Sequence, residues 1–168
     1  MSELTKLLEG VKIERKSLGE VSEINRGVRV TKRDLRIEGK YPVVSGGTGF
    51  MGYVDEFNRE ADTITIAQYG SAGYVKWQKD KFWANDVAFS IFPNNNKLNK
   101  KYLYHFLLSK QEYLYSISNR TAVPYSISKD KILNVCIPIP SPDNPEKSLK
   151  IQQEIVRILD SLSEETNL

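Results

Sequence analysis

The chain has 168 residues, of which 40% are hydrophobic and 27% charged, a composition typical of one globular domain large enough to bury a core. No apolar run reaches the ~18 residues of a membrane-spanning helix, and the N-terminus contains no signal-peptide core. A single cysteine and a single histidine exclude an internal disulfide and a His/Cys metal site, so we expect a cytoplasmic protein without zinc.

Positive charge is concentrated in two segments, although the net charge of the whole chain is only +3. Residues 26–40 contain six Lys or Arg side chains against two carboxylates, and residues 96–131 contain seven against two. Each segment on its own is compatible with an ordinary solvated surface. Because the two segments flank a glycine-rich region, they also favour a surface that faces phosphates.

The N-terminal part predicts a strand, a helix and an exposed loop. Residues 12–16 are typical of a short edge strand, and Ser17 and Glu20 have the spacing of a capping box. Apolar residues at positions 18, 21 and 24 share one helical face, which predicts a helix that ends at Gly27. Residues 28–40 lack a period and indicate an exposed loop.

The central part alternates short strands with loops of glycine, hydroxyl, amide and aromatic residues. Strands are predicted at 41–44 and 63–67, glycine loops follow them at 45–49 and 68–73, and 82–86 leads into a further strand. Glycine admits close approach of a ligand to the backbone, because it adds no bulk and tolerates positive φ. Since no catalytic set accompanies these loops, we expect a large polar ligand.

The C-terminal part predicts helices around one more strand. A helix capped by Asn99 and extending to residue 117 precedes a polar loop at 119–128, a helical turn at 128–133 and a buried strand at 135–140. A linker at 142–145 leads to a final helix that starts near Glu146. Its apolar stripe either packs on the domain or meets a partner helix. The proposed partner-helix positions are Ile151, Ile155, Ile158, Leu159 and Leu162.

The sequence offers no catalytic or nucleotide-binding motif in a supporting context. Residues 47–52 spell G-x-G-x-x-G, but no strand–helix–strand unit follows them, so we expect no dinucleotide site. The phosphate-binding motif G-x-x-x-x-G-K-[ST] is absent. His105 lies between two aromatic residues in a predicted helix, and Ser71 has no nearby histidine, so neither indicates nucleophilic catalysis.

A series of short motifs occurs in one order along most of the chain. The motifs are Leu18-Gly19-Glu20-Val21, Ser45-Gly46-Gly47 with Gly52-Tyr53, Tyr69-Gly70-Ser71-Ala72-Gly73, Phe82-Trp83-Ala84-Asn85-Asp86, Tyr102-Leu103-Tyr104, Ile137-Pro138-Ile139-Pro140, and Gln152-Gln153-Glu154-Ile155-Val156 with Ile158-Leu159-Asp160. Together they resemble the target recognition domain of a type I restriction–modification DNA specificity subunit. Such subunits carry two recognition domains separated by long helices. We therefore expect a half-subunit or a fragment, with a recognition domain at 1–141 and a linker and the start of a spacer helix at 142–168.

The resemblance implies an α/β (α+β) fold, with a twisted, mostly antiparallel sheet, flanking helices and a protruding C-terminal helix. It implies recognition of one half of a bipartite DNA site, without catalysis and without a cofactor in this chain. The methyl donor and ATP are expected on partner subunits. The implied partners are double-stranded DNA, methyltransferase (modification) subunits, a restriction subunit and a second specificity half-subunit.

Candidate DNA contacts follow from side-chain chemistry and position. The basic segment supplies candidates for phosphate contacts, which position the protein without reading sequence; they are Arg26, Arg29, Lys32 and Arg33. Amides, hydroxyls and arginine on the loops are the candidates for reading base edges. These are Gln68, Tyr69, Ser71, Asn119, Arg120, Thr121 and Tyr125.

Two other functional classes stay open at this point. The glycine loops would also suit a peptide- or protein-interaction module whose basic surface is incidental, and an enzyme with an unrecognised site is a further alternative. Salt dependence separates them, because a protein that contacts several phosphates loses affinity steeply as salt rises.

Overall fold

A computed structural model describes residues 2–166, and their fold divides into two compact units that interleave along the chain. Unit 1 comprises residues 1–23, 93–107 and 134–168, and unit 2 comprises residues 24–92 and 108–133. These packing units do not follow the functional boundary expected at residue 142, which stays a prediction. The last two residues of the predicted segment 142–168 lie outside the described part of the chain.

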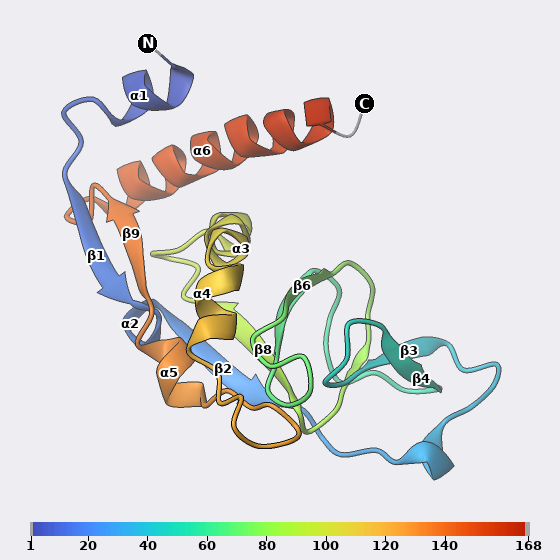
Figure 1. The fold of residues 1–168 in the computed structure, drawn as a ribbon. Coiled ribbons are helices and arrows are strands. Elements are labelled where there is room, and N and C mark those ends of the chain that lie inside the picture. The colour runs from blue at the N-terminus through green and yellow to red at the C-terminus, as the bar shows by residue number, and fades with distance from the viewer. Residues whose placement is uncertain (1, 167–168) are drawn as a thin grey trace. The chain divides into compact units, whose positions relative to one another are not determined.

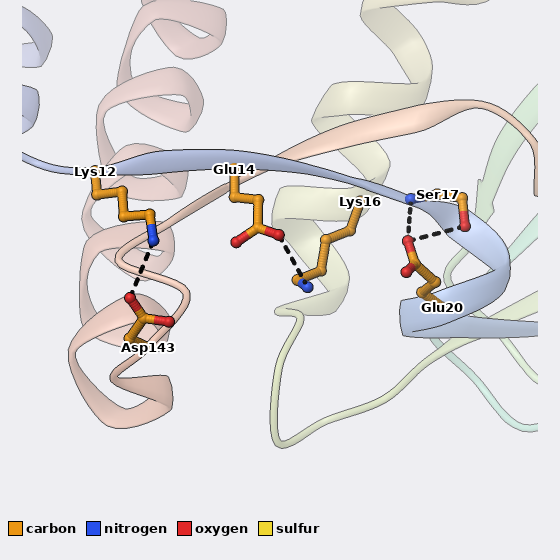
Figure 2. Close-up of polar contacts among 6 residues, drawn as sticks. All are labelled: Lys12, Glu14, Lys16, Ser17, Glu20 and Asp143. Atoms are coloured by element: carbon orange, nitrogen blue, oxygen red, sulfur yellow. Dashed lines mark hydrogen bonds and ion pairs between the residues drawn. The ribbon is translucent and has the colours of Figure 1, made fainter.

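In unit 1, strand β1 (Ile13–Ser17) pairs antiparallel with β9 (Cys136–Pro140), as Figure 1 shows. Both strands were predicted. The capping box is also confirmed, since the Glu20 carboxylate accepts hydrogen bonds from Ser17 N–H at 2.8 Å and Ser17 Oγ at 3.1 Å (Figure 2). These two bonds lower the pKa of Glu20. Lys12, just before β1, forms an ion pair with Asp143, which follows β9; its Nζ lies 3.2 Å from Asp143 Oδ2 (Figure 2).

The helix that follows the capping box is shorter than predicted. Helix α2 (Leu18–Val21) makes one turn, and the chain then continues as strand β2 (Ser22–Arg26). Gly27 therefore does not cap a helix. A Cβ atom at Gly27 would lie 1.9 Å from the carbonyl oxygen of Ala84, so glycine is needed there for a close backbone approach.

The helices of unit 1 are α1 (Glu3–Leu8), α3 (Lys100–Ser109, whose last two residues belong to unit 2) and α6 (Pro145–Thr166). Buried Gln152 of α6 accepts a hydrogen bond from Asn99 N–H at 2.8 Å and donates to Lys97 O at 2.9 Å. Asn99 Oδ1 accepts from Tyr102 N–H at 2.9 Å, which confirms the predicted cap. Helix α1 was not predicted; it lies beside α6 in Figure 1.

The apolar stripe of α6 is largely internal to unit 1. Ile151, Ile155 and Ile158 are each at most 8% exposed, so the prediction that these three side chains form a partner-facing surface is corrected. Burial of their apolar area stabilises α6 on its own unit. Leu159 is partly exposed and Leu162 is 50% exposed.

Unit 2 contains two small sheets rather than the single sheet predicted. A four-stranded sheet has the order β2–β8–β5–β6, with β8 at Ala88–Pro93, β5 at Thr63–Ala67 and β6 at Val75–Gln78. A three-stranded sheet has the order β4–β3–β7, with β4 at Phe50–Val54, β3 at Tyr41–Val44 and β7 at Trp83–Ala84. All five residues of β5 are buried, as expected for the β-branched run that predicted it.

Most strand pairs in unit 2 are antiparallel; β3 with β7 is parallel. Residues 47–52 run from the β3–β4 turn into strand β4, so the G-x-G-x-x-G motif opens no helix. Short helices complete the unit: η1 (Lys32–Asp34), α4 (Gln111–Ser116) and α5 (Lys129–Leu133). The single helix predicted over 99–117 is in fact α3 and α4, separated at Lys110.

Candidate nucleic-acid interface

Three loops of unit 2 meet through backbone hydrogen bonds. They are the loop at 45–49 after β3, the loop at 68–73 after β5 and the loop at 119–126. Ser71 N–H donates to Gly46 O at 2.9 Å, and Gly70 N–H donates to Tyr125 O at 3.0 Å. The residues predicted to read bases come from the second and third of these loops. We call the three loops together the loop cluster.

Glycine is required where these loops touch one another. A Cβ atom at Gly46 would lie 2.2 Å from Tyr69 O, whereas a Cβ atom at Gly47 would meet nothing within 4 Å. Gly70 has a φ of +81°, a left-handed conformation that glycine adopts without strain. The glycines at 46 and 70 thus allow loop-to-loop approach, rather than only the approach of a ligand that the sequence suggested.

The loop at 119–126 is exposed and is closed at its base. Asn119 N–H donates to Ser126 O at 2.6 Å, and Ser126 N–H donates back to Asn119 O at 3.1 Å. Asn119 Oδ1 accepts from Thr121 N–H at 3.0 Å and from Thr121 Oγ1 at 2.7 Å. The amide oxygen of Asn119 and the hydroxyl of Thr121 therefore support the turn, while the Asn119 NH₂ group stays available as a donor.

Gln68 does not lie where a base reader must lie. The residue is only 4% exposed, and its Oε1 atom is buried without a hydrogen-bond partner in the described structure. Its backbone accepts from Ile127 N–H at 2.9 Å and donates to Val87 O at 2.9 Å. The prediction that Gln68 reads a base edge is therefore corrected. The continuous burial of β5 extends one residue past the end of the strand, to a position that the sequence assigned to the loop.

The other predicted readers are accessible or partly so. Tyr69 and Tyr125 are each 40% exposed, and Ser71 is half-buried with its N–H bonded to Gly46. Arg120 is exposed, and its Nε atom donates to Tyr115 O at 3.2 Å. The structure thus brings six of the seven predicted readers onto two adjoining loops, where Asn119 and Thr121 form a turn of their own.

The predicted phosphate-contacting residues are exposed at the end of β2 and in the segment that follows it. Arg29, Lys32 and Arg33 form no ion pair within the described residues. Thr31 caps η1, and its hydrogen bonds to Asp34 lower the pKa of that carboxyl group. The Arg26 guanidinium lies 5.8 Å from the centre of the Phe89 ring, a partial attachment to the sheet that the other three lack.

A buried asparagine links this basic segment to the loop cluster. Asn85 Oδ1 accepts a hydrogen bond from Val30 N–H at 3.0 Å, and Asn85 Nδ2 lies 3.3 Å from Ser45 Oγ. Trp83 Nε1 adds a hydrogen bond to Val28 O at 2.8 Å. The sequence indicated no role of its own for Asn85; the signal that could have found it was its place in the Phe82-Trp83-Ala84-Asn85-Asp86 motif.

Within residues 2–166 no group of three His, Cys, Asp or Glu side chains is placed to hold a metal ion. His105 Nε2 lies 2.7 Å from Asp160 Oδ1 in unit 1, where this pair joins α3 to α6. No helix in the same described range is long and apolar enough to cross a membrane.

Residues 10–168 match the family model of the type I restriction modification DNA specificity domain. The chain belongs to this family. Membership confirms the resemblance drawn from the ordered motifs, and with it the assignment to DNA specificity rather than to catalysis. Members of the family bind no cofactor themselves.

Two curated relatives extend the match. A putative type I restriction enzyme specificity subunit of Haemophilus influenzae is 34% identical over 165 residues, which cover 95% of this chain and 40% of that protein. The EcoR124I/EcoR124II specificity subunit of Escherichia coli is 34% identical over 173 residues, which cover 97% of this chain and 41% of that protein. The chain thus spans about two fifths of the length of these relatives.

Solved structures of the family share the fold. The S subunit of a type I restriction–modification system from M. genitalium aligns with a TM-score of 0.82 at 23% identity, over 98% of this chain and 42% of that one. The HsdS subunit from Thermoanaerobacter tengcongensis aligns with a TM-score of 0.67 at 18% identity, over 96% of this chain and 42% of that one. The mixed α/β fold with mostly antiparallel sheets and a long C-terminal helix is confirmed.

Proposed function

We propose that this chain recognises one half of a bipartite DNA site for a type I restriction–modification complex. The observation that carries the proposal is the loop cluster, which presents Tyr69, Arg120 and Tyr125, with the basic segment attached to it through Asn85. Polar and aromatic side chains can meet base edges while exposed cations meet phosphates. The cluster and the basic segment belong to the same unit, so both can act on one duplex.

The two groups of side chains have different tasks. Arg29, Lys32 and Arg33 contact phosphates and position the protein, with Arg26 at the edge of the group. The readers are Tyr69, Ser71, Asn119, Arg120, Thr121 and Tyr125. Because Gln68 is buried, it supports the loops from within and contacts no base.

The partners follow from the family and from the chain's length. Methyltransferase subunits supply the methyl donor site, and a restriction subunit supplies the ATP site, in a cytoplasmic complex. Since the chain spans about two fifths of its curated relatives, a second recognition domain comes from further polypeptide or from a second half-subunit. The exposed end of α6, near Leu159 and Leu162, is the place where the two join.

Binding of the 168-residue chain to duplex DNA tests the proposal. A random duplex library is selected on the chain, and affinity for the selected duplex is measured over a range of salt concentrations. We expect a preferred sequence and a log–log salt slope of about −0.9 for each phosphate contacted. A peptide-binding module would show neither a preferred duplex nor this slope.

Two further measurements distinguish a single recognition domain from an enzyme and from a protein that binds a whole bipartite site by itself. The purified chain should transfer no methyl group to DNA until methyltransferase subunits are added. Joining a second recognition domain should raise affinity for a two-half site by roughly 10²–10⁴-fold, because the second binding event becomes intramolecular. Nanomolar binding of a single half-site by the monomer in physiological salt would contradict this arrangement.

A further inference from the structure

Arg120 is exposed, yet its side chain is held on several sides. Its Nε atom donates to Tyr115 O at 3.2 Å and lies 3.3 Å from Ser118 Oγ. Its guanidinium carbon lies 5.5 Å from the centre of the Tyr115 ring and 5.1 Å from the centre of the Tyr125 ring. These neighbours come from both sides of Arg120 in the chain. We call Tyr115, Ser118, Arg120 and Tyr125 the arginine clamp.

The clamp engages the Nε–H donor of the Arg120 guanidinium and leaves the two Nη groups for a ligand. Guanidinium has five N–H donors in a planar fork, and the Nε donor is already engaged within the protein. The two Nη groups carry the other four donors. Among the described residues Arg120 forms no ion pair, so no carboxylate competes for this end of the fork.

A guanidinium held in a fixed plane suits a guanine base edge better than it suits a phosphate. A phosphate contact needs mainly positive charge, which Arg29 and Lys32 supply; within residues 2–166 neither forms an ion pair. Bidentate recognition of guanine O6 and N7 instead requires the guanidinium plane to align with the base edge. Because the clamp orders this plane before binding, less side-chain freedom is lost when the base is contacted.

We propose that Arg120 reads a guanine in the major groove through its two Nη groups, and that Tyr115, Ser118 and Tyr125 are positioning residues that fix its plane. This inference rests on the proposed recognition of DNA and names one base that the chain reads. The base of the loop is closed by the Asn119–Ser126 backbone pair, and Tyr125 O is bonded to Gly70 N–H. The clamp is therefore attached to the loop cluster as well as to α4.

The first test changes the DNA and leaves the protein intact. Each guanine of the selected duplex is replaced in turn by adenine, by 7-deazaguanine, which lacks the N7 acceptor, or by inosine, which keeps O6 and N7. At one position we expect adenine to weaken binding about 5- to 150-fold, 7-deazaguanine to weaken it clearly and inosine to leave it within about twofold. Tolerance of 7-deazaguanine at every position would overturn the inference.

The second test couples the protein to that base. In Arg120→Ala, 7-deazaguanine at the same position should have no further effect, and specificity should relax at that position only. Arg15→Ala, which removes an equal charge from an exposed site on β1, should keep the wild-type response. Equal loss by Arg120→Ala on selected and random duplexes would make Arg120 a phosphate contact and overturn the inference.

The third test addresses the positioning residues. Tyr125→Ala removes the ring beside the guanidinium and should weaken binding about 2- to 5-fold on the guanine-containing duplex. On the 7-deazaguanine duplex, Tyr125→Ala should cost nothing more. Tyr113→Ala, at an exposed tyrosine of α4, is the matched control. Equal weakening by Tyr125→Ala on the guanine and 7-deazaguanine duplexes would overturn the positioning argument.

Failure of this inference and failure of the proposed function give different results. Binding is measured up to about 10⁻⁴ M chain, where even non-specific DNA binders are retained. Absence of binding to any duplex would overturn DNA recognition and the guanine contact with it. Sequence-preferring binding that no 7-deazaguanine substitution weakens would overturn the guanine contact alone.

Discussion

Asn85 Oδ1 accepts a hydrogen bond from Val30 N–H at 3.0 Å, and through this contact a buried amide holds the basic segment of unit 2. The same side chain reaches the first glycine loop, where its Nδ2 lies 3.3 Å from Ser45 Oγ. One residue thus joins the basic segment to the loop cluster, the two parts proposed to position and to read DNA.

Asn85→Ala should therefore weaken binding on every duplex. Loss of the bond to Val30 N–H leaves a partly buried donor unsatisfied, which costs about 1–3 kcal/mol of unfolding free energy. Urea unfolding measures the stability change, and fluorescence anisotropy on selected and random duplexes measures the affinity change. Asn95→Ala, at an exposed asparagine, is the control. Weakened binding on the selected duplex alone would show that Asn85 serves the reading loops and not the basic segment.

Gly46 and Gly47 provide a matched pair for the loop cluster. Gly46→Ala should displace the loop at 68–73, because its Cβ atom would lie 2.2 Å from Tyr69 O. Gly47→Ala places a Cβ atom in open space and should be tolerated. We expect a lower melting temperature and loss of sequence preference for the first variant only. Similar behaviour of the two variants would mean that contact between these loops is not needed for recognition.

Lys32→Ala should weaken binding to selected and random duplexes by the same factor. If Lys32 neutralises one phosphate, the log–log salt slope should become shallower by about 0.9. Lys6→Ala removes an equal charge from an exposed position on α1 and should leave the slope unchanged. A change of sequence preference in Lys32→Ala would move this residue from the positioning group to the reading group.

The hydroxyl of Tyr102 links α3 to β9, and we expect its contribution to stability to depend on pH. Its hydroxyl donates to Pro138 O at 2.7 Å, and burial raises the pKa of Tyr102 to about 12. Tyr102→Phe should lower stability by about 1 kcal/mol at neutral pH. The unfolded chain ionises from about pH 10, so the wild-type advantage is complete below that pH and declines as pH rises towards 12. Urea unfolding of both proteins at neutral and alkaline pH checks this; a constant difference would refute it.

The sequence predicted correctly those elements whose signals lie within a few neighbouring residues. The capping box at Ser17 and Glu20, the cap at Asn99 and the buried strand β9 each depend on spacing within a few residues. The predicted helix ending at Gly27 failed because Gly27 is fixed by a backbone contact with Ala84, more than fifty positions later in the chain. No local period carries that information.

The sequence predicted which residue types form the candidate site, but not which of them are buried or how its parts are linked by hydrogen bonds. Glycine, tyrosine and arginine on loops indicated a binding surface, and the ordered motifs identified the family. The burial of Gln68 and the link through Asn85 depend on how β5 and the segment after β2 pack. Similarly, the stripe of α6 predicted an apolar surface without saying that its own unit covers Ile151, Ile155 and Ile158.

Unit 2 is assembled from two separate stretches of the chain, 24–92 and 108–133. Gly46 and Tyr69 belong to the first stretch, whereas Arg120 and Tyr125 belong to the second. A genetic crossover between codons 92 and 108 would combine loops of the cluster from two different parents. An exchange of the whole block 24–133 would keep the loops of one parent together, and residues 93–107 would be inherited with it.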